Sequence, residues 1–160
     1  MLHVRLICVG KLKEKFYREA CAEYEKRLKG YCKLEIIELT EQRLPDSPSQ
    51  AQIDAALAKE AEAIRAKIPA GSAVVAMCIE GRQISSDELA QFLADRANSG
   101  AGDVAFVIGS SHGLSDEVKK AAALRFSMGR ITMPHQLARL VLTEQIYRAC
   151  TINAGMKYHK

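Results

Sequence analysis

Short apolar runs alternate along the chain with longer segments in which apolar residues recur every three or four positions. Runs rich in Val, Ile and Leu are typical of strands, and the longer recurrence is typical of amphipathic helices. The pattern predicts strands at Leu2–Val9, Lys33–Leu39, Ala73–Ile79 and Val104–Ile108, and a further strand near Arg130–Met133. The run at Ala73–Ile79 is continuously apolar, which indicates a strand buried on both faces.

The segments between these strands predict helices. In Lys13–Leu28 the apolar side chains recur every four residues and form one face: Phe16, Ala20, Tyr24 and Leu28. The Ala-rich segment Ala51–Lys67 reads as a second helix, with Ser47 or Ser49 expected as its N-cap and Pro69 beyond its end.

Three more helices are predicted further along the chain. Ser85 and Glu88 have the spacing of a capping box, which begins a helix that runs to about Ala97. Ser115 is followed by two acidic residues, and these suit the positive N-terminal end of a helix. Pro134 begins the last helix, which runs to about Ile152.

Strands that alternate with helices predict an α/β fold with a mostly parallel sheet. The chain has 160 residues, no internal repeat and no composition shift that would mark a linker. This length suits one compact unit and is short for two. We therefore expect residues 1–160 to form a single domain.

Three of the predicted strand ends carry glycines or loops. Gly81 is expected in a turn after Ala73–Ile79, Gly109–Gly113 follows Val104–Ile108, and Met128–Met133 lies near the last predicted strand. Ligands of open parallel sheets bind at the carboxyl ends of the strands, where glycine lets the backbone approach them closely. We expect one pocket here, although each glycine taken alone is also explained by its turn.

Several other chemistries do not fit the sequence. Gly10-Lys11 and the glycines at 109 and 113 lack the spacing of phosphate-binding loops, and the four histidines lack metal-ligand spacing. The five cysteines are scattered, which predicts neither a disulfide framework nor a metal site, and Cys8 and Cys78 are expected to be small core residues. No segment has the length of a membrane span or the form of a signal peptide. A reducing cytoplasmic location is expected.

Charge is concentrated at the C-terminal end. Residues 124–160 hold six Lys and Arg against one acid, Glu144, although the net charge of the whole chain is only +4. A basic end on a nearly neutral body suits an anionic partner such as nucleic acid, and an ordinary solvated surface is the alternative.

The C-terminal quarter closely resembles the RlmH family, in SMGRITMPHQLARLVLTEQIYRA (residues 127–149) and YHK (158–160). The resemblance continues through FVIGSSHGLS (106–115), VGKLKEK (9–15) and EYEKRL (23–28), and thus spans essentially the whole chain. This family comprises SPOUT-class, S-adenosylmethionine-dependent methyltransferases that modify N3 of a pseudouridine in large-subunit ribosomal RNA. The resemblance implies a SPOUT-type parallel-sheet domain with a C-terminal trefoil knot, acting as a homodimer on ribosomal RNA within the ribosome.

The resemblance also implies which residues bind S-adenosylmethionine. Matching the family's cofactor positions onto this sequence selects Met77, Gly109, Met128, Gly129, Arg130, Ile131, Thr132 and Met133. Two residues depart from the family pattern: Ser110 replaces a second glycine, and Met77 replaces a leucine. Both changes are compatible with a pocket lined by backbone.

Catalytic candidates follow from the chemistry of the acceptor. Methyl transfer depends mainly on positioning, and the imide proton at N3 must leave. Arg139 is a candidate for holding phosphate or developing negative charge, with a surface or dimer salt bridge as the alternative. His159 is a candidate proton acceptor and Tyr158 a candidate for stacking on the base, unless the tail only packs against a subunit. His135 is expected to line the pocket or to orient the last helix.

Two other functions compete with methyl transfer. A ribosome-binding module that has lost its chemistry would explain the basic C-terminal end equally well. An α/β enzyme on a small soluble substrate is the third possibility, and the basic end argues against it.

Overall fold

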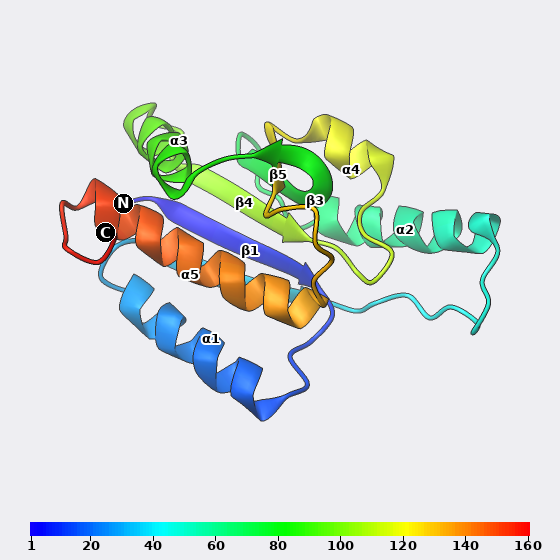
Figure 1. The fold of residues 1–160 in the computed structure, drawn as a ribbon. Coiled ribbons are helices and arrows are strands. Elements are labelled where there is room, and N and C mark those ends of the chain that lie inside the picture. Colours follow the sequence, from blue (N-terminus) through cyan, green and yellow to red (C-terminus); the bar gives the residue numbers. More distant parts are fainter.

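The computed structural model describes residues 1–160 and contains a five-stranded parallel sheet with helices on both faces (Figure 1). The sheet order is β2-β1-β4-β3-β5, and every neighbouring pair is parallel. The elements in chain order are β1 (His3–Val9), α1 (Lys15–Leu28), β2 (Lys33–Leu39), α2 (Gln50–Arg65), β3 (Ala73–Gln83), α3 (Ser86–Asn98), β4 (Asp103–Ile108), α4 (Asp116–Ala121), β5 (Leu124–Ser127) and α5 (His135–Asn153). The predicted α/β class is confirmed.

The apolar core lies in two layers, because successive side chains of a strand point to opposite faces of the sheet. In β1, Val4 and Leu6 face the cluster that includes side chains of α1, α3 and α5, whereas Ile7 and Val9 face a smaller cluster under α2 and α4. Burial of both faces explains why these strands read as continuous apolar runs.

Helix ends largely follow the sequence signals. Ser49, rather than Ser47, is the N-cap of α2, and it forms a capping box with Gln52. Ser85 and Glu88 form the predicted capping box of α3, and the Ser115 hydroxyl accepts a hydrogen bond from the Val118 amide at the start of α4.

The predicted strand near Arg130–Met133 is wrong. The last strand is β5 at Leu124–Ser127, where Phe126 and Ser127 are buried beside β3, while Arg130–Met133 is a loop with Ile131 exposed. The short run at 124–127 is sheet because it finds a ladder partner in β3, which local periodicity does not reveal.

The strand β3 is longer than predicted. We expected it to end at Ile79 with Gly81 in a turn, but it continues to Gln83. Met77 and Arg82 both pair with Phe126, so residues 78–81 form a bulge outside the ladder. A Cβ on Gly81 would lie 2.7 Å from the Arg125 carbonyl oxygen, so the bulge depends on glycine at this position.

Two side-chain predictions also need correction. Phe16 was expected on the buried face of α1 and is 62% exposed, whereas Cys21 and Leu28 are buried there. Cys8 is buried as expected, but Cys78 is only half-buried. None of the helices has both the length and the apolar composition of a membrane span. The trefoil knot and the single-domain organisation stay predictions.

Candidate active site

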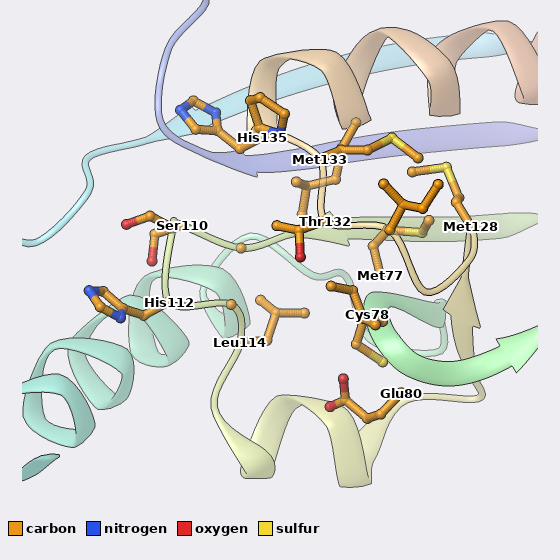
Figure 2. A pocket seen from close by; sticks show the side chains of 18 of the residues that line it. Met77, Cys78, Glu80, Ser110, His112, Leu114, Met128, Thr132, Met133 and His135 are labelled. Carbon is orange, nitrogen blue, oxygen red and sulfur yellow. The ribbon is translucent and has the colours of Figure 1, made fainter.

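A cleft of about 790 Å³ opens at the carboxyl ends of β3, β4 and β5 (Figure 2). Three walls form it: the bulge of β3, the loop after β4, and the loop between β5 and α5. Apolar side chains such as Met77, Leu114 and Met133 lie beside a few polar ones, and this composition is common in sites for small organic ligands. The three strand ends selected from the sequence therefore meet at one place.

Seven of the eight predicted cofactor residues line this cleft: Met77, Gly109, Met128, Gly129, Ile131, Thr132 and Met133. The eighth, Arg130, lies in the same loop, but its side chain is exposed and is not part of the lining.

The loop between β5 and α5 offers unused backbone donors. None of the N–H groups of residues 130–133 donates a hydrogen bond to another protein atom, whereas the Gly129 N–H donates to the Ser127 hydroxyl. Free backbone donors need a partner in solvent or in a ligand. Four consecutive free donors in a loop that lines a cleft are suited to hold the polar edges of a ligand.

The loop after β4 is tightly packed. A Cβ on Gly109 would lie 2.2 Å from the Gly113 carbonyl oxygen, so any side chain at this position would push the loop apart. Ser110, the departure from the family pattern, is buried, and its hydroxyl donates to Glu60 Oε1 of α2 at 2.8 Å. The other oxygen of the buried Glu60 accepts the Gln42 N–H at 2.9 Å. The carboxylate thus anchors this wall of the cleft to α2.

His135 lines the cleft at the start of α5. Its ring packs against Gly10, where φ is +115° and an added Cβ would lie 2.8 Å from Cε1 of the imidazole. The next residue, Gln136, accepts the Lys13 N–H at 2.7 Å through Oε1. The loop between β1 and α1 is therefore held against the mouth of the cleft.

Arg139 is not in the cleft lining. Its side chain is only 6% exposed, and its guanidinium donates to Glu38 Oε2 of β2 at 2.7 Å. The alternative for Arg139 was a surface or dimer salt bridge. The ion pair found is instead within one chain, and its Arg139 end is buried.

Tyr158 and His159 also lie outside the cleft of their own chain. The Tyr158 hydroxyl donates to Glu144 at 3.0 Å, and burial raises the pKa of this phenol with help from hydrogen bonds to Tyr24 and Glu144. His159 contacts Arg148 and lies 3.7 Å from Asp87. Glu144 is nine residues beyond His135, which places it about 14 Å further along the axis of α5. Figure 1 shows the C-terminus at the far end of this helix.

The cleft contains residues that the sequence did not single out. Glu80 comes from the bulge of β3 and forms an ion pair of 2.5 Å with Lys119 of α4, and the Lys119 hydrogen bond is the main cause of a lowered Glu80 pKa. No sequence signal joins two residues so far apart. Cys78 and His112 also line the cleft, and only the position of His112 inside the glycine loop could have indicated it. No cluster of three His, Cys, Asp or Glu side chains is placed to hold a metal ion.

Comparison with known proteins identifies the family. Residues 2–159 match the family described as "Predicted SPOUT methyltransferase". Proteins named "Ribosomal RNA large subunit methyltransferase H" from Streptococcus uberis, Leuconostoc mesenteroides and Limosilactobacillus reuteri are 46%, 47% and 49% identical to this chain over 159 residues. In each case the match covers 99% of this chain and 100% of the relative.

Solved structures support the fold. A probable methyltransferase from Bordetella pertussis superposes with a TM-score of 0.56 at 17% identity, covering 92% of this chain and 93% of that one. A probable methylase family protein from Haemophilus influenzae gives a TM-score of 0.52 at 17% identity, covering 98% of this chain and 70% of that one. Sequence match and fold agree, and the chain belongs to the RlmH family of SPOUT methyltransferases.

Proposed function

We propose that this chain uses S-adenosylmethionine to methylate N3 of a pseudouridine in large-subunit ribosomal RNA, within the ribosome and in the cytoplasm. Membership of a methyltransferase family supports the reaction class. The relatives named as ribosomal RNA large subunit methyltransferases, aligned over their whole length, support the RNA substrate. The observation that carries the proposal is the cleft, where seven of the eight predicted cofactor residues meet and the loop at residues 130–133 leaves four backbone N–H groups free.

The residues of the cleft fit an adenosyl group and a side chain that bears a sulfonium. The free N–H groups of residues 130–133 suit the polar edge of a purine, and Met77, Leu114 and Met133 suit apolar faces. Glu80 is the one carboxylate in the lining, and carboxylates accept hydrogen bonds from ribose hydroxyls. When bound, S-adenosylmethionine supplies an electrophilic methyl group, so the protein has mainly to position the acceptor.

His135 is the only one of the four proposed catalytic residues in the lining of the cleft. Its ring packs against Gly10, and in this proposal it lines the pocket and orients the start of α5. In this proposal Arg139 does not contact the acceptor, because its guanidinium is bound by Glu38. It contributes by fixing the position of α5.

The roles proposed for Tyr158 and His159 require a homodimer. Both side chains lie along the distal half of α5 and contact Glu144 and Arg148, away from the cleft of the same chain. If they stack on the base and accept its proton, they do so in the cleft of a second copy. This arrangement makes each active site a product of two chains.

Two measurements test the proposed function. Calorimetry should detect binding of S-adenosylmethionine, and the chain should transfer tritiated methyl groups to ribosomes that lack the modification. Salt-dependent ribosome binding without cofactor binding would instead identify a ribosome-binding module. Methylation of free nucleosides but not of ribosomes would point to a small soluble substrate.

A further inference from the structure

Phe16 is exposed among basic residues at the start of α1, beside the half-buried Tyr17. Phe16 is 62% exposed, and its ring centroid lies 4.5 Å from that of Tyr17. A single exposed apolar side chain is common on protein surfaces, so the exposure of Phe16 gains meaning only from the basic residues around it. We refer to residues 10–18 as the N-terminal patch.

The N-terminal patch is strongly basic. It contains one acid, Glu14, and four exposed basic residues: Lys11, Lys13, Lys15 and Arg18. Lys15 lies 3.6 Å from Glu19, but Lys11 and Lys13 form no ion pair. Two unpaired lysines beside the exposed ring of Phe16 form a surface that is suited to phosphates and bases together.

The loop that carries these lysines is held from both sides. Gln136 Oε1 accepts the Lys13 N–H at 2.7 Å and the Glu14 N–H at 3.4 Å. Arg18 Nη1 donates to the Lys13 carbonyl at 2.6 Å and to the Leu12 carbonyl at 3.3 Å. Since the backbone is already ordered, binding a ligand here costs little further conformational entropy.

The N-terminal patch lies at the mouth of the cleft. Gly10 contacts the ring of His135, which lines the cleft, and Gln136 is the next residue of α5. Figure 1 shows the chain leaving β1 beside the start of α5. A polymer whose target base enters the cleft would therefore pass over this surface.

The charge favours RNA over a second copy of the chain as the partner. A two-fold interface centred on this surface would bring two basic patches together, and like charges across an interface oppose association. RNA offers the complement to both features, because its phosphates attract lysines and its unpaired bases stack on aromatic rings.

Resting on the proposed RNA substrate, we infer that the N-terminal patch binds ribosomal RNA next to the target base. Lys11 and Lys13 contact backbone phosphates, and Phe16 stacks on an unpaired base. The basic C-terminal segment is thus not the only RNA-binding surface of the molecule.

Two variants of the full-length chain test the two kinds of contact. In Lys11→Gln/Lys13→Gln, ribosome binding should weaken and the slope of log affinity against log salt should fall by about 1.4, for two lost contacts to single-stranded phosphates. In Phe16→Ala, ribosome binding should weaken about tenfold with an unchanged slope, and Phe16→Tyr should retain it. In both variants KM for ribosomes should rise, while kcat and S-adenosylmethionine affinity stay unchanged.

Lys26→Gln/Lys29→Gln is the matched control, because it removes two exposed lysines from the other end of the same helix. The control should bind ribosomes as the unaltered chain does. Unchanged affinity and slope in the patch variants would overturn the inference, and so would a change of oligomeric mass in Phe16→Ala, which would identify a protein contact. If ribosome binding depends on the patch but no methyl group is transferred, the proposed reaction fails and the inference stands.

Discussion

The ion pair between Arg139 and Glu38 joins α5 to β2 across 101 residues of sequence. Its two ends differ in solvation, because the Arg139 side chain is 6% exposed and that of Glu38 is 37% exposed. Arg139 Nε has no hydrogen-bond partner, and Glu38 is the only carboxylate in ion-pair contact with the guanidinium. Burial raises the pKa of Glu25, and the charge of Arg139 acts to lower it. Losing the carboxylate would strand a buried cation, whereas losing the cation leaves an acid that water still reaches.

We predict that Glu38→Ala lowers the free energy of unfolding by about 3 kcal/mol and that Arg139→Met lowers it by about 1 kcal/mol. Urea unfolding of the two variants measures the difference. Equal losses would contradict this account of the pair. A loss of methyl transfer in Arg139→Met that far exceeds the loss in Glu38→Gln would show that Arg139 also has a catalytic role.

The loop after β4 is positioned by an element that does not itself line the cleft. Glu60 of α2 is buried, accepts one hydrogen bond from the Ser110 hydroxyl and another from the Gln42 N–H, and has no cationic partner. Ser111 adds a hydrogen bond to Glu41 at 3.1 Å. The loop therefore depends on α2 and on the segment before it for its position.

Glu60→Ala should lower the free energy of unfolding by about 1–3 kcal/mol, because the half-buried Gln42 N–H and the buried Ser110 hydroxyl lose their acceptor. It should also weaken S-adenosylmethionine binding, since the loop is released. Glu60→Gln is the matched control, because its amide can accept from Gln42 and donate to Ser110. Calorimetric titration of both variants with S-adenosylmethionine measures the difference. Equal affinities for the cofactor would mean that Glu60 does not position the loop after β4.

At the scale of the whole molecule, the cleft and the C-terminal tail of one chain are separated. His135 stands at the cleft, whereas Tyr158 and His159 contact residues of the distal half of α5. The proposed homodimer brings them together only if each tail serves the other chain's cleft.

Subunit mixing tests this arrangement. His159→Ala should lose methyl transfer but keep cofactor affinity, and Thr132→Trp should lose both by filling the cleft. After random exchange of equal amounts, about a quarter of the unaltered activity should return, because half of the dimers then hold one intact cleft with one intact tail. No recovery after verified exchange would place the tail's function within its own chain or outside catalysis.

Part of the molecule was predictable from local pattern. Four of the five strands, the helix starts at Ser85 and Ser115, and the α/β class all follow from periodicity and capping chemistry, which act over a few residues. The resemblance selected loops that do meet in one cleft. The buried face of α1 was predicted wrongly at Phe16. This residue has the spacing of the apolar face, but it lies at the end of the helix, which extends beyond the core.

The amino-acid sequence by itself determined the order of the elements, the family and the three strand ends at which a ligand would bind, since these are written in short-range patterns and in long motifs. Only the tertiary structure decided that β5 lies at Leu124–Ser127, that Glu80 joins Lys119 in the cleft, and that Arg139 is bound by Glu38. The physical reason is the same in each case. A ladder partner or a counter-ion comes from a distant part of the chain, and only the packed sheet brings the two within contact.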